Sequence, residues 1–142
     1  AVASVIMGFV KAPPASEPIP DAVKAFGAKT VPAILKELDE DGGEWAQKQA
    51  KNIRRKSPLA MCVTFEAIRR GAKKNFKEVM TQELDLSLGF LKTQDFYEGI
   101  RAQLIDKDRN PKWSHAAVSK VTESQVQRVF RKSAKPSQQF LK

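Results

Sequence analysis

Apolar residues recur at helical spacing along most of the chain, and no alternating apolar and polar pattern of useful length accompanies them. Over residues 76–92 the apolar positions are three or four residues apart, which places them on one face of an amphipathic helix. These positions are Phe76, Val79, Met80, Leu84, Leu88 and Leu91. The pattern predicts an all-α fold of five to seven amphipathic helices.

Capping residues and helix breakers indicate where these helices begin and end. Ser57 followed by Pro58 is a typical N-cap and first helical residue. Three pairs have the spacing of a capping box, namely Asn75 with Glu78, Asp95 with Glu98, and Thr122 with Gln125. The expected helices cover residues 21–26, 44–56, 58–70 and 76–92, and three more begin after Thr30, Asp95 and Thr122.

The first twenty residues differ in composition from the rest of the chain. Residues 1–10 are apolar, and residues 12–20 contain four Pro in nine positions. Pro fixes φ and lacks an N–H group, so such a run is neither helix nor central strand. We therefore expect an apolar segment and a Pro-rich linker over residues 1–20, followed by a helical domain over residues 21–142.

Charge is concentrated in the middle of the sequence. The chain has 25 Lys and Arg against 16 Asp and Glu, for a net charge of +9, and nine of the basic residues lie in residues 51–77 with Glu66 as the only acid there. Such a stretch forms either a solvated helix face or a surface that meets phosphate on RNA or a nucleotide-bearing ligand. The expected phosphate-facing residues are Arg54, Arg55, Arg69, Arg70, Lys73 and Lys74.

Residue composition excludes several classes of function. A single Cys, Cys62, rules out a disulfide framework and a Cys-rich zinc site, and a single His, His115, leaves little scope for metal binding. The sequence contains no Gly-rich phosphate loop and no apolar run of the roughly 18 residues that a membrane span needs. Composition and spacing alone therefore lead only to a soluble, basic, helical domain without a metal or a covalently bound cofactor.

Residues 95–113 carry a more specific signal. Their sequence, DFYEGIRAQLIDKDRNPKW, resembles the C-terminal signature of 3-hydroxyisobutyryl-CoA hydrolases, a branch of the enoyl-CoA hydratase/isomerase (crotonase) superfamily. The resemblance extends upstream to Ser57-Pro58 and downstream to Val121-Thr122, and it covers about residues 21–130.

The resemblance implies that this chain is only the helical C-terminal portion of a larger enzyme. In the family an N-terminal β/α spiral core supplies the oxyanion hole and the catalytic acids, and neither is present in these 142 residues. The helical portion would pack on that core, cover the acyl-CoA pocket and mediate subunit contacts. The intact parent would hydrolyse 3-hydroxyisobutyryl-CoA during valine breakdown in the mitochondrial matrix, whereas this chain alone would be catalytically silent.

The resemblance also implies roles for individual residues. Lys107 corresponds approximately to a Lys that contacts a CoA phosphate, and Asp95, Glu98, Gly99 and Arg101 belong to the signature as structural residues. Glu83 lies in the apolar stripe of residues 76–92, so we expect either a stripe-edge residue that reaches water or a buried carboxylate paired with Arg101 or Arg69.

Two other functions are consistent with the sequence. The basic stretch suits a mitochondrial ribosomal small-subunit protein derived from the same hydrolase family, which would bind rRNA and other proteins through that face. An unrelated helical interaction module is the third. Whichever holds, a helical portion separated from its core exposes apolar surface, around residues 1–10 and at Phe96, Tyr97 and Ile100, so we expect self-association in isolation.

Overall fold

The computed structural model describes residues 20–131, and within that range it contains seven α-helices and no strand. The α-helices are α2 (Pro20–Phe26), α3 (Val31–Asp41), α4 (Glu44–Arg54), α5 (Pro58–Gly71), α6 (Phe76–Phe90), α7 (Gln94–Ile100) and α8 (Glu123–Val129). A π-helical turn at Arg101–Ile105 continues α7, and a 3-10 turn lies at Val118–Lys120. The predicted all-α class is confirmed. The apolar segment and most of the Pro-rich linker lie outside the described residues.

The expected helix starts are confirmed where a capping side chain fixes them. The side chains of Thr30, Ser57, Asn75 and Thr122 each accept a hydrogen bond from a backbone N–H in the first turn of their helices. The expected cap at Asp95 is wrong. Thr93 caps α7 instead by accepting from the Phe96 N–H at 3.3 Å, and Asp95 is buried inside the helix.

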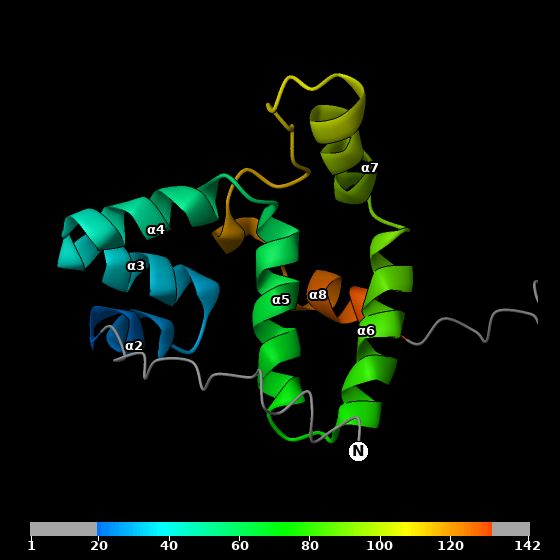
Figure 1. Cartoon of the computed structure of the whole chain (residues 1–142), viewed down its shortest axis with the longest axis horizontal. Coiled ribbons are helices and arrows are strands. Elements are labelled where there is room, and N and C mark those ends of the chain that lie inside the picture. The colour runs from blue at the N-terminus through cyan, green and yellow to red at the C-terminus, as the bar shows by residue number, and fades with distance from the viewer. Residues whose placement is uncertain (1–19, 132–142) are drawn as a thin grey trace, which may run out of the picture.

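Helix α5 lies at the centre of the fold, with α2, α3 and α4 on one side and α6 and α8 on the other (Figure 1). Each side has its own small core. The first core contains Ile34 and Leu38 of α3 with Ala46 and Ala50 of α4, while the second contains Leu59, Val63, Leu86, Val126 and Val129. The half-buried Cys62 of α5 packs against both cores, which is a structural position for this thiol.

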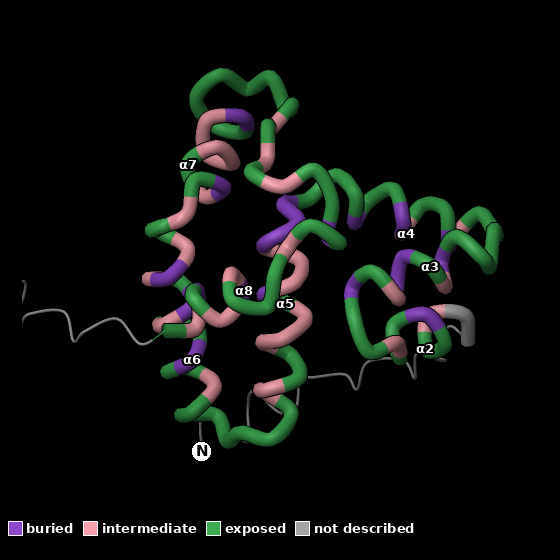
Figure 2. The backbone as a smooth tube through the Cα atoms, turned by 180° about the vertical axis from the view of Figure 1, so that it is seen from behind, coloured by how far each residue is buried: buried purple, intermediate pink, exposed green. Residues whose placement is uncertain are grey.

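Few residues of α6 are buried, as Figure 2 shows. Helix α6 packs on α8 through a short buried face that includes Leu86 and Gly89. Much of its predicted apolar stripe points outward instead. The exposed fractions on this stripe are 81% for Phe76, 49% for Met80, 57% for Leu84 and 44% for Leu91. The periodicity thus identified a real apolar face, but that face is only partly covered by other described residues.

Close contact between α6 and α8 depends on the absence of a side chain at Gly89. A Cβ atom there would lie 2.2 Å from the carbonyl oxygen of Val129, which is backbone and has no rotamer to change. We therefore predict that Gly89→Ala lowers the free energy of unfolding by about 1–3 kcal/mol, because α8 must move away from α6.

The matched control is Gly71→Ala, at the end of α5, where the added methyl would meet only a Val79 methyl group at 4.0 Å. This control gains helix propensity and is expected to be neutral or slightly stabilising. Urea unfolding of both variants measures the difference. Equal stabilities for the two variants would contradict the close packing of α6 on α8.

Candidate functional site

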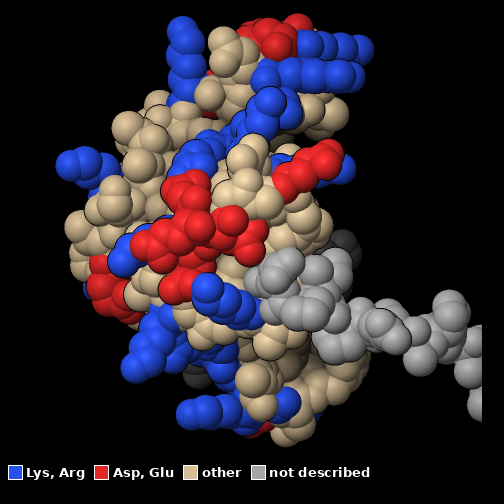
Figure 3. Space-filling model, turned by 90° about the vertical axis from the view of Figure 1, so that its left-hand side faces the viewer, with Lys and Arg blue, Asp and Glu red and all other residues tan. Residues whose placement is uncertain are grey.

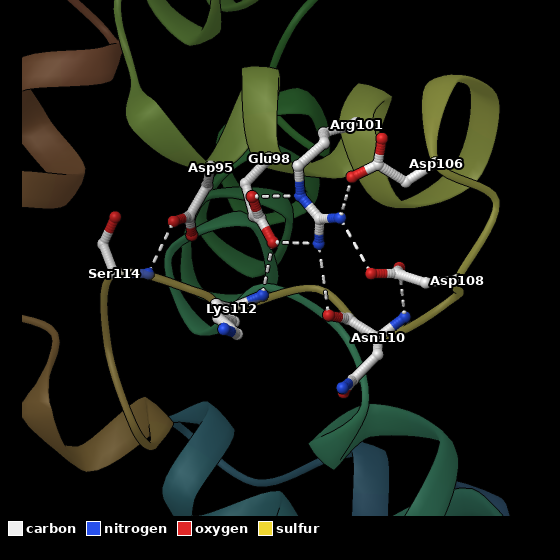
Figure 4. A network of polar contacts seen from close by, with 8 residues as sticks. All are labelled: Asp95, Glu98, Arg101, Asp106, Asp108, Asn110, Lys112 and Ser114. Atoms are coloured by element: carbon white, nitrogen blue, oxygen red, sulfur yellow. Dashed lines mark hydrogen bonds and ion pairs between the residues drawn. The ribbon is translucent and has the colours of Figure 1, made fainter.

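The signature segment of residues 95–113 folds around two carboxylates of α7, Asp95 and Glu98, which bond different partners. Asp95 of α7 is 4% exposed and points toward the start of α5, where it accepts a hydrogen bond from the Ser57 hydroxyl. Its other oxygen accepts from the Ser114 N–H at 2.8 Å (Figure 4). One buried side chain therefore joins α5, α7 and the segment that follows the signature.

These hydrogen bonds decide the charge state of Asp95. Burial raises its pKa, but the bonds from Ser57 and Ser114 and the nearby His115 act in the opposite direction and together hold the pKa below its ordinary value. Asp95 is therefore a structural anion with its oxygens already occupied. Its role is that of a positioning residue, because each of its two oxygens accepts a hydrogen bond from a different segment of the chain.

Arg101 donates hydrogen bonds to the three other carboxylates of the signature. Its guanidinium bonds both oxygens of Glu98 at 2.8 and 2.9 Å, Asp106 at 2.6 Å, Asp108 at 2.8 Å and the Asn110 carbonyl at 3.3 Å (Figure 4). Glu98 also accepts from the Lys112 N–H at 2.6 Å. This Arg101 cluster folds the loop that follows α7 back onto the helix.

The hydrogen bonds from Arg101 and from the Lys112 N–H lower the pKa of Glu98 to about 2 and leave it ionised at neutral pH. The Asn110 N–H and Arg101 likewise lower the pKa of Asp108. The same carboxylates raise the pKa of Arg101.

The loop closed by Arg101 contains two residues in an unusual backbone conformation. Lys107 and Arg109 have φ angles of 57° and 54°, the left-handed region that non-glycine side chains rarely adopt. Both side chains are exposed. Lys107 is therefore accessible to a ligand, which is the condition that a contact with a CoA phosphate requires.

The other residues predicted from the sequence lie in different places. Gly99 faces the Trp113 ring, since a Cβ added there would lie 3.6 Å from the indole. Glu83 is exposed and forms no ion pair with another described residue, so it is the stripe-edge residue that reaches water, and the alternative pairing with Arg101 or Arg69 is wrong. Arg101 is already held by Glu98, and Arg69 donates to the Lys29 carbonyl at 3.0 Å and stacks over Phe65.

The basic stretch of residues 51–77 does not form one surface. Arg54 and Arg55 lie before the start of α5, whereas the other four predicted residues lie at its far end, and the 14 residues of α5 separate the two groups by about 21 Å. Several of these side chains are engaged within the chain, because Arg54 bonds Asp39, Arg70 bonds Glu66, and Lys74 bonds Gln82. Basic side chains lie above and below an acidic patch in the view of Figure 3.

Two apolar cavities adjoin the signature. A groove of about 710 Å³ runs between α5 and α6, with Val63, Leu86 and Phe90 in its lining and Glu83 at its side. A second cavity of about 690 Å³ is bounded by Met61, Gly99, Ile100 and Leu104, so α7 and the π-helical turn form part of its wall. Neither contains the arrangement of nucleophile, base and oxyanion donors that acyl transfer requires. Over residues 20–131 no three His, Cys, Asp or Glu side chains gather as a metal site, and no helix has the length and apolarity to cross a membrane.

The chain matches the family model of enoyl-CoA hydratase/isomerase over residues 5–130. It is 40% identical over 106 residues to the mitochondrial 3-hydroxyisobutyryl-CoA hydrolase of Homo sapiens, and 39% identical over 107 residues to the protein of the same name in Danio rerio. Each match covers 75% of this chain and 28% of the relative, so the chain spans little more than a quarter of these relatives.

Solved structures of CoA-thioester enzymes also match most of this chain. A carnitinyl-CoA dehydratase from Mycobacterium thermoresistibile has a TM-score of 0.79 and 33% identity, with 96% of this chain and 40% of that one covered. An enoyl-CoA hydratase from Rhodobacter sphaeroides has a TM-score of 0.75 and 29% identity, with 92% and 41% covered. The described helices therefore adopt an arrangement found within larger CoA-thioester enzymes.

The Ser57–Asp95 contact makes the first prediction for this site. Ser57→Ala removes both the N-cap of α5 and a hydrogen bond to a buried carboxylate, so we expect a loss of about 2–4 kcal/mol in the free energy of unfolding. Thr30→Ala removes only the exposed cap of α3 and should cost about 1 kcal/mol. Urea unfolding measures both, and equal losses would show that the buried contact adds nothing to the cap.

The Arg101 cluster makes the second prediction, which concerns pH. The pKa of Glu98 is lowered from 4.5 to about 2 in the folded chain, so its stabilisation is complete above the ordinary value and is lost as the pH falls from about 4.5 to about 2. In Arg101→Gln the pKa of Glu98, followed by NMR titration, should rise toward 4.5, and the acid loss of stability over that window should shrink. Arg54→Gln breaks a different exposed ion pair and should leave Glu98 unchanged. An unaltered Glu98 titration in Arg101→Gln would contradict the assignment.

Proposed function

Because this chain belongs to the enoyl-CoA hydratase/isomerase family, we propose that it is the C-terminal portion of a 3-hydroxyisobutyryl-CoA hydrolase. The observation that carries the proposal is the identity of about 40% to curated hydrolases of that name over three quarters of the chain. In this role it packs on a catalytic core and covers the acyl-CoA pocket. The thioester chemistry belongs to the core, and the described residues supply no catalytic group of their own.

The exposed apolar stripe of α6 supports packing on a core. Phe76, Met80 and Leu84 project from one side of the helix, and the apolar groove between α5 and α6 lies beside them. Exposed apolar surface of this kind is typical of an interface. We propose that the core of the parent covers this surface and that the chain self-associates through it when the core is absent.

The signature loop supports a contact with the substrate. The Arg101 cluster neutralises Asp106 and Asp108, which flank Lys107 in sequence, and Lys107 itself extends into solvent. The backbone of Lys107 is in the left-handed region, and its ammonium group pairs with no acid among the described residues. Such a Lys is suited to contact the phosphates of an acyl-CoA. The names of the relatives support a mitochondrial location, and we place the protein in the matrix, in valine breakdown.

The basic residues support one other role, that of a mitochondrial ribosomal small-subunit protein derived from this hydrolase family. Lys73, in the turn after α5, and Lys77, in the first turn of α6, are exposed and form no ion pair with another described residue, so they are available to rRNA phosphates. Such a protein would no longer need thioesterase activity, and a hydrolysis assay therefore separates the two roles.

The test is an assay of 3-hydroxyisobutyryl-CoA cleavage by the longer parent protein and by this chain alone. We expect turnover by the parent and none by the chain. Met80→Glu with Leu84→Glu places charges on the exposed stripe and should lower the parent's turnover by at least about tenfold, because it weakens docking on the core. Lys77→Glu with Thr81→Glu, at exposed polar positions of the same helix, is the control and should stay near the parental rate. Turnover by the chain alone, or an inactive parent, would refute the hydrolase proposal.

A further inference from the structure

A third cavity, of about 350 Å³, lies between the start of α3, one face of α5 and the start of α8. None of its lining residues belongs to the signature of residues 95–113, and it shares no residue with the two apolar cavities that adjoin the signature. Its lining combines an apolar wall with side chains of both charges. These charges lie at opposite ends of the cavity.

Lys29 and Arg69 form the cationic end. The Arg69 guanidinium donates to the Lys29 carbonyl at 3.0 Å, which holds the two residues next to each other. Neither side chain forms an ion pair with another described residue. Helix α3 begins directly after Thr30, so the positive end of its dipole also lies here. An anion is therefore favoured at this end.

Glu123 forms the anionic end. Its carboxylate lies near the Cys62 thiol, because burial and then the charge of Glu123 raise the pKa of that thiol. Glu123 accepts a hydrogen bond from the neutral Gln127 amide and forms no ion pair with another described residue. Glu66 also lines the cavity, but Arg70 binds it at 2.7 Å. Glu123 is therefore the lining carboxylate that is open to a cationic ligand group.

Helix α5 sets the distance between the two ends. Cys62, near Glu123, and Arg69, beside Lys29, are seven residues apart on this helix, which is about 10 Å along its axis. Lys29 and Glu123 thus line one cavity without pairing with each other. The wall between the ends is apolar and consists of Val31, Pro32, Phe65, Val118, Val121 and Val126.

We propose that this cavity binds a small aliphatic zwitterion, whose carboxylate contacts Lys29 and Arg69 and whose ammonium group contacts Glu123. Charge-assisted hydrogen bonds form at both ends, and the methylene groups between the two charges leave water for the apolar wall. The volume lies at the lower end of the range for small-molecule sites and suits a ligand of this size. The site goes beyond the proposed function, because it uses no signature residue and no catalytic core.

The experiment is NMR titration of the 142-residue chain with ε-aminocaproate, which carries a carboxylate and an ammonium group at the ends of an unbranched chain. Hexanoate lacks the ammonium group and pentylamine lacks the carboxylate, so each should bind at least about tenfold more weakly. Leucine has the same atomic composition but carries its two charges on one carbon. It should also bind at least about tenfold more weakly, because it cannot reach both ends of the cavity.

Two variants test the ends separately. Lys29→Ala should weaken binding of ε-aminocaproate and hexanoate by about tenfold and leave pentylamine unchanged, whereas Glu123→Gln should weaken ε-aminocaproate and pentylamine and leave hexanoate unchanged. The matched controls are Lys77→Ala and Glu83→Gln, which remove the same charges from exposed positions of α6 outside the cavity lining. Each control should change the affinities by less than about twofold.

The proposal is overturned if millimolar ε-aminocaproate produces no saturable shift of the amides that line the cavity. It is also overturned if hexanoate, pentylamine or leucine binds as tightly, since the cavity would then not recognise two separated charges. Equal losses in the variants and their controls would show only a general attraction of ions to a charged chain and would overturn it as well. None of these outcomes bears on hydrolysis by the longer parent.

Discussion

The arrangement of the signature depends on one buried carboxylate. Asp95 accepts hydrogen bonds from Ser57, the N-cap residue of α5, and from the backbone of Ser114, and so fixes α7 against α5 and against the segment that follows the signature. A buried anion is tolerated only when its oxygens are satisfied, and each of these partners also depends on Asp95 for its own position. The Arg101 cluster then folds the intervening loop over the exposed side of α7. A neutral or apolar side chain at Asp95 would leave α7 and this loop without their common anchor.

The chain has too little core of its own to cover all its apolar surface. Two small clusters lie on either side of α5, and several large side chains of α6 remain more than 40% exposed. The relatives and solved structures that match it are more than twice as long, and the match covers little more than a quarter of the curated hydrolases. An exposed stripe on a well-capped helix is the expected result when the surface that covers it belongs to the rest of such a protein.

Local signals predicted the helices, whereas longer-range contacts decided the site. The caps at Ser57, Asn75 and Thr122 were predictable because a side chain and a backbone N–H three residues away are enough to form them. The same spacing at Asp95 misled, because a partner 38 residues earlier in the sequence competes for that carboxylate. Periodicity showed that Phe76, Met80 and Leu84 share a face, but periodicity does not say whether anything covers that face. The left-handed backbone at Lys107 and Arg109 had no signal in the sequence, because neither position is a Gly, Asn or Asp, the residue types that favour this region.

The central claim is that the α6 stripe is covered by the rest of a longer hydrolase. Amide hydrogen exchange over residues 76–91, measured in the 142-residue chain and in the longer parent protein, tests it most directly, because docking raises the free energy of local opening. The account predicts slower exchange across this helix in the parent, with residues 44–54 of α4 unchanged as the internal reference. Identical exchange of α6 in the two proteins would contradict the claim and would leave the stripe without a partner in the parent.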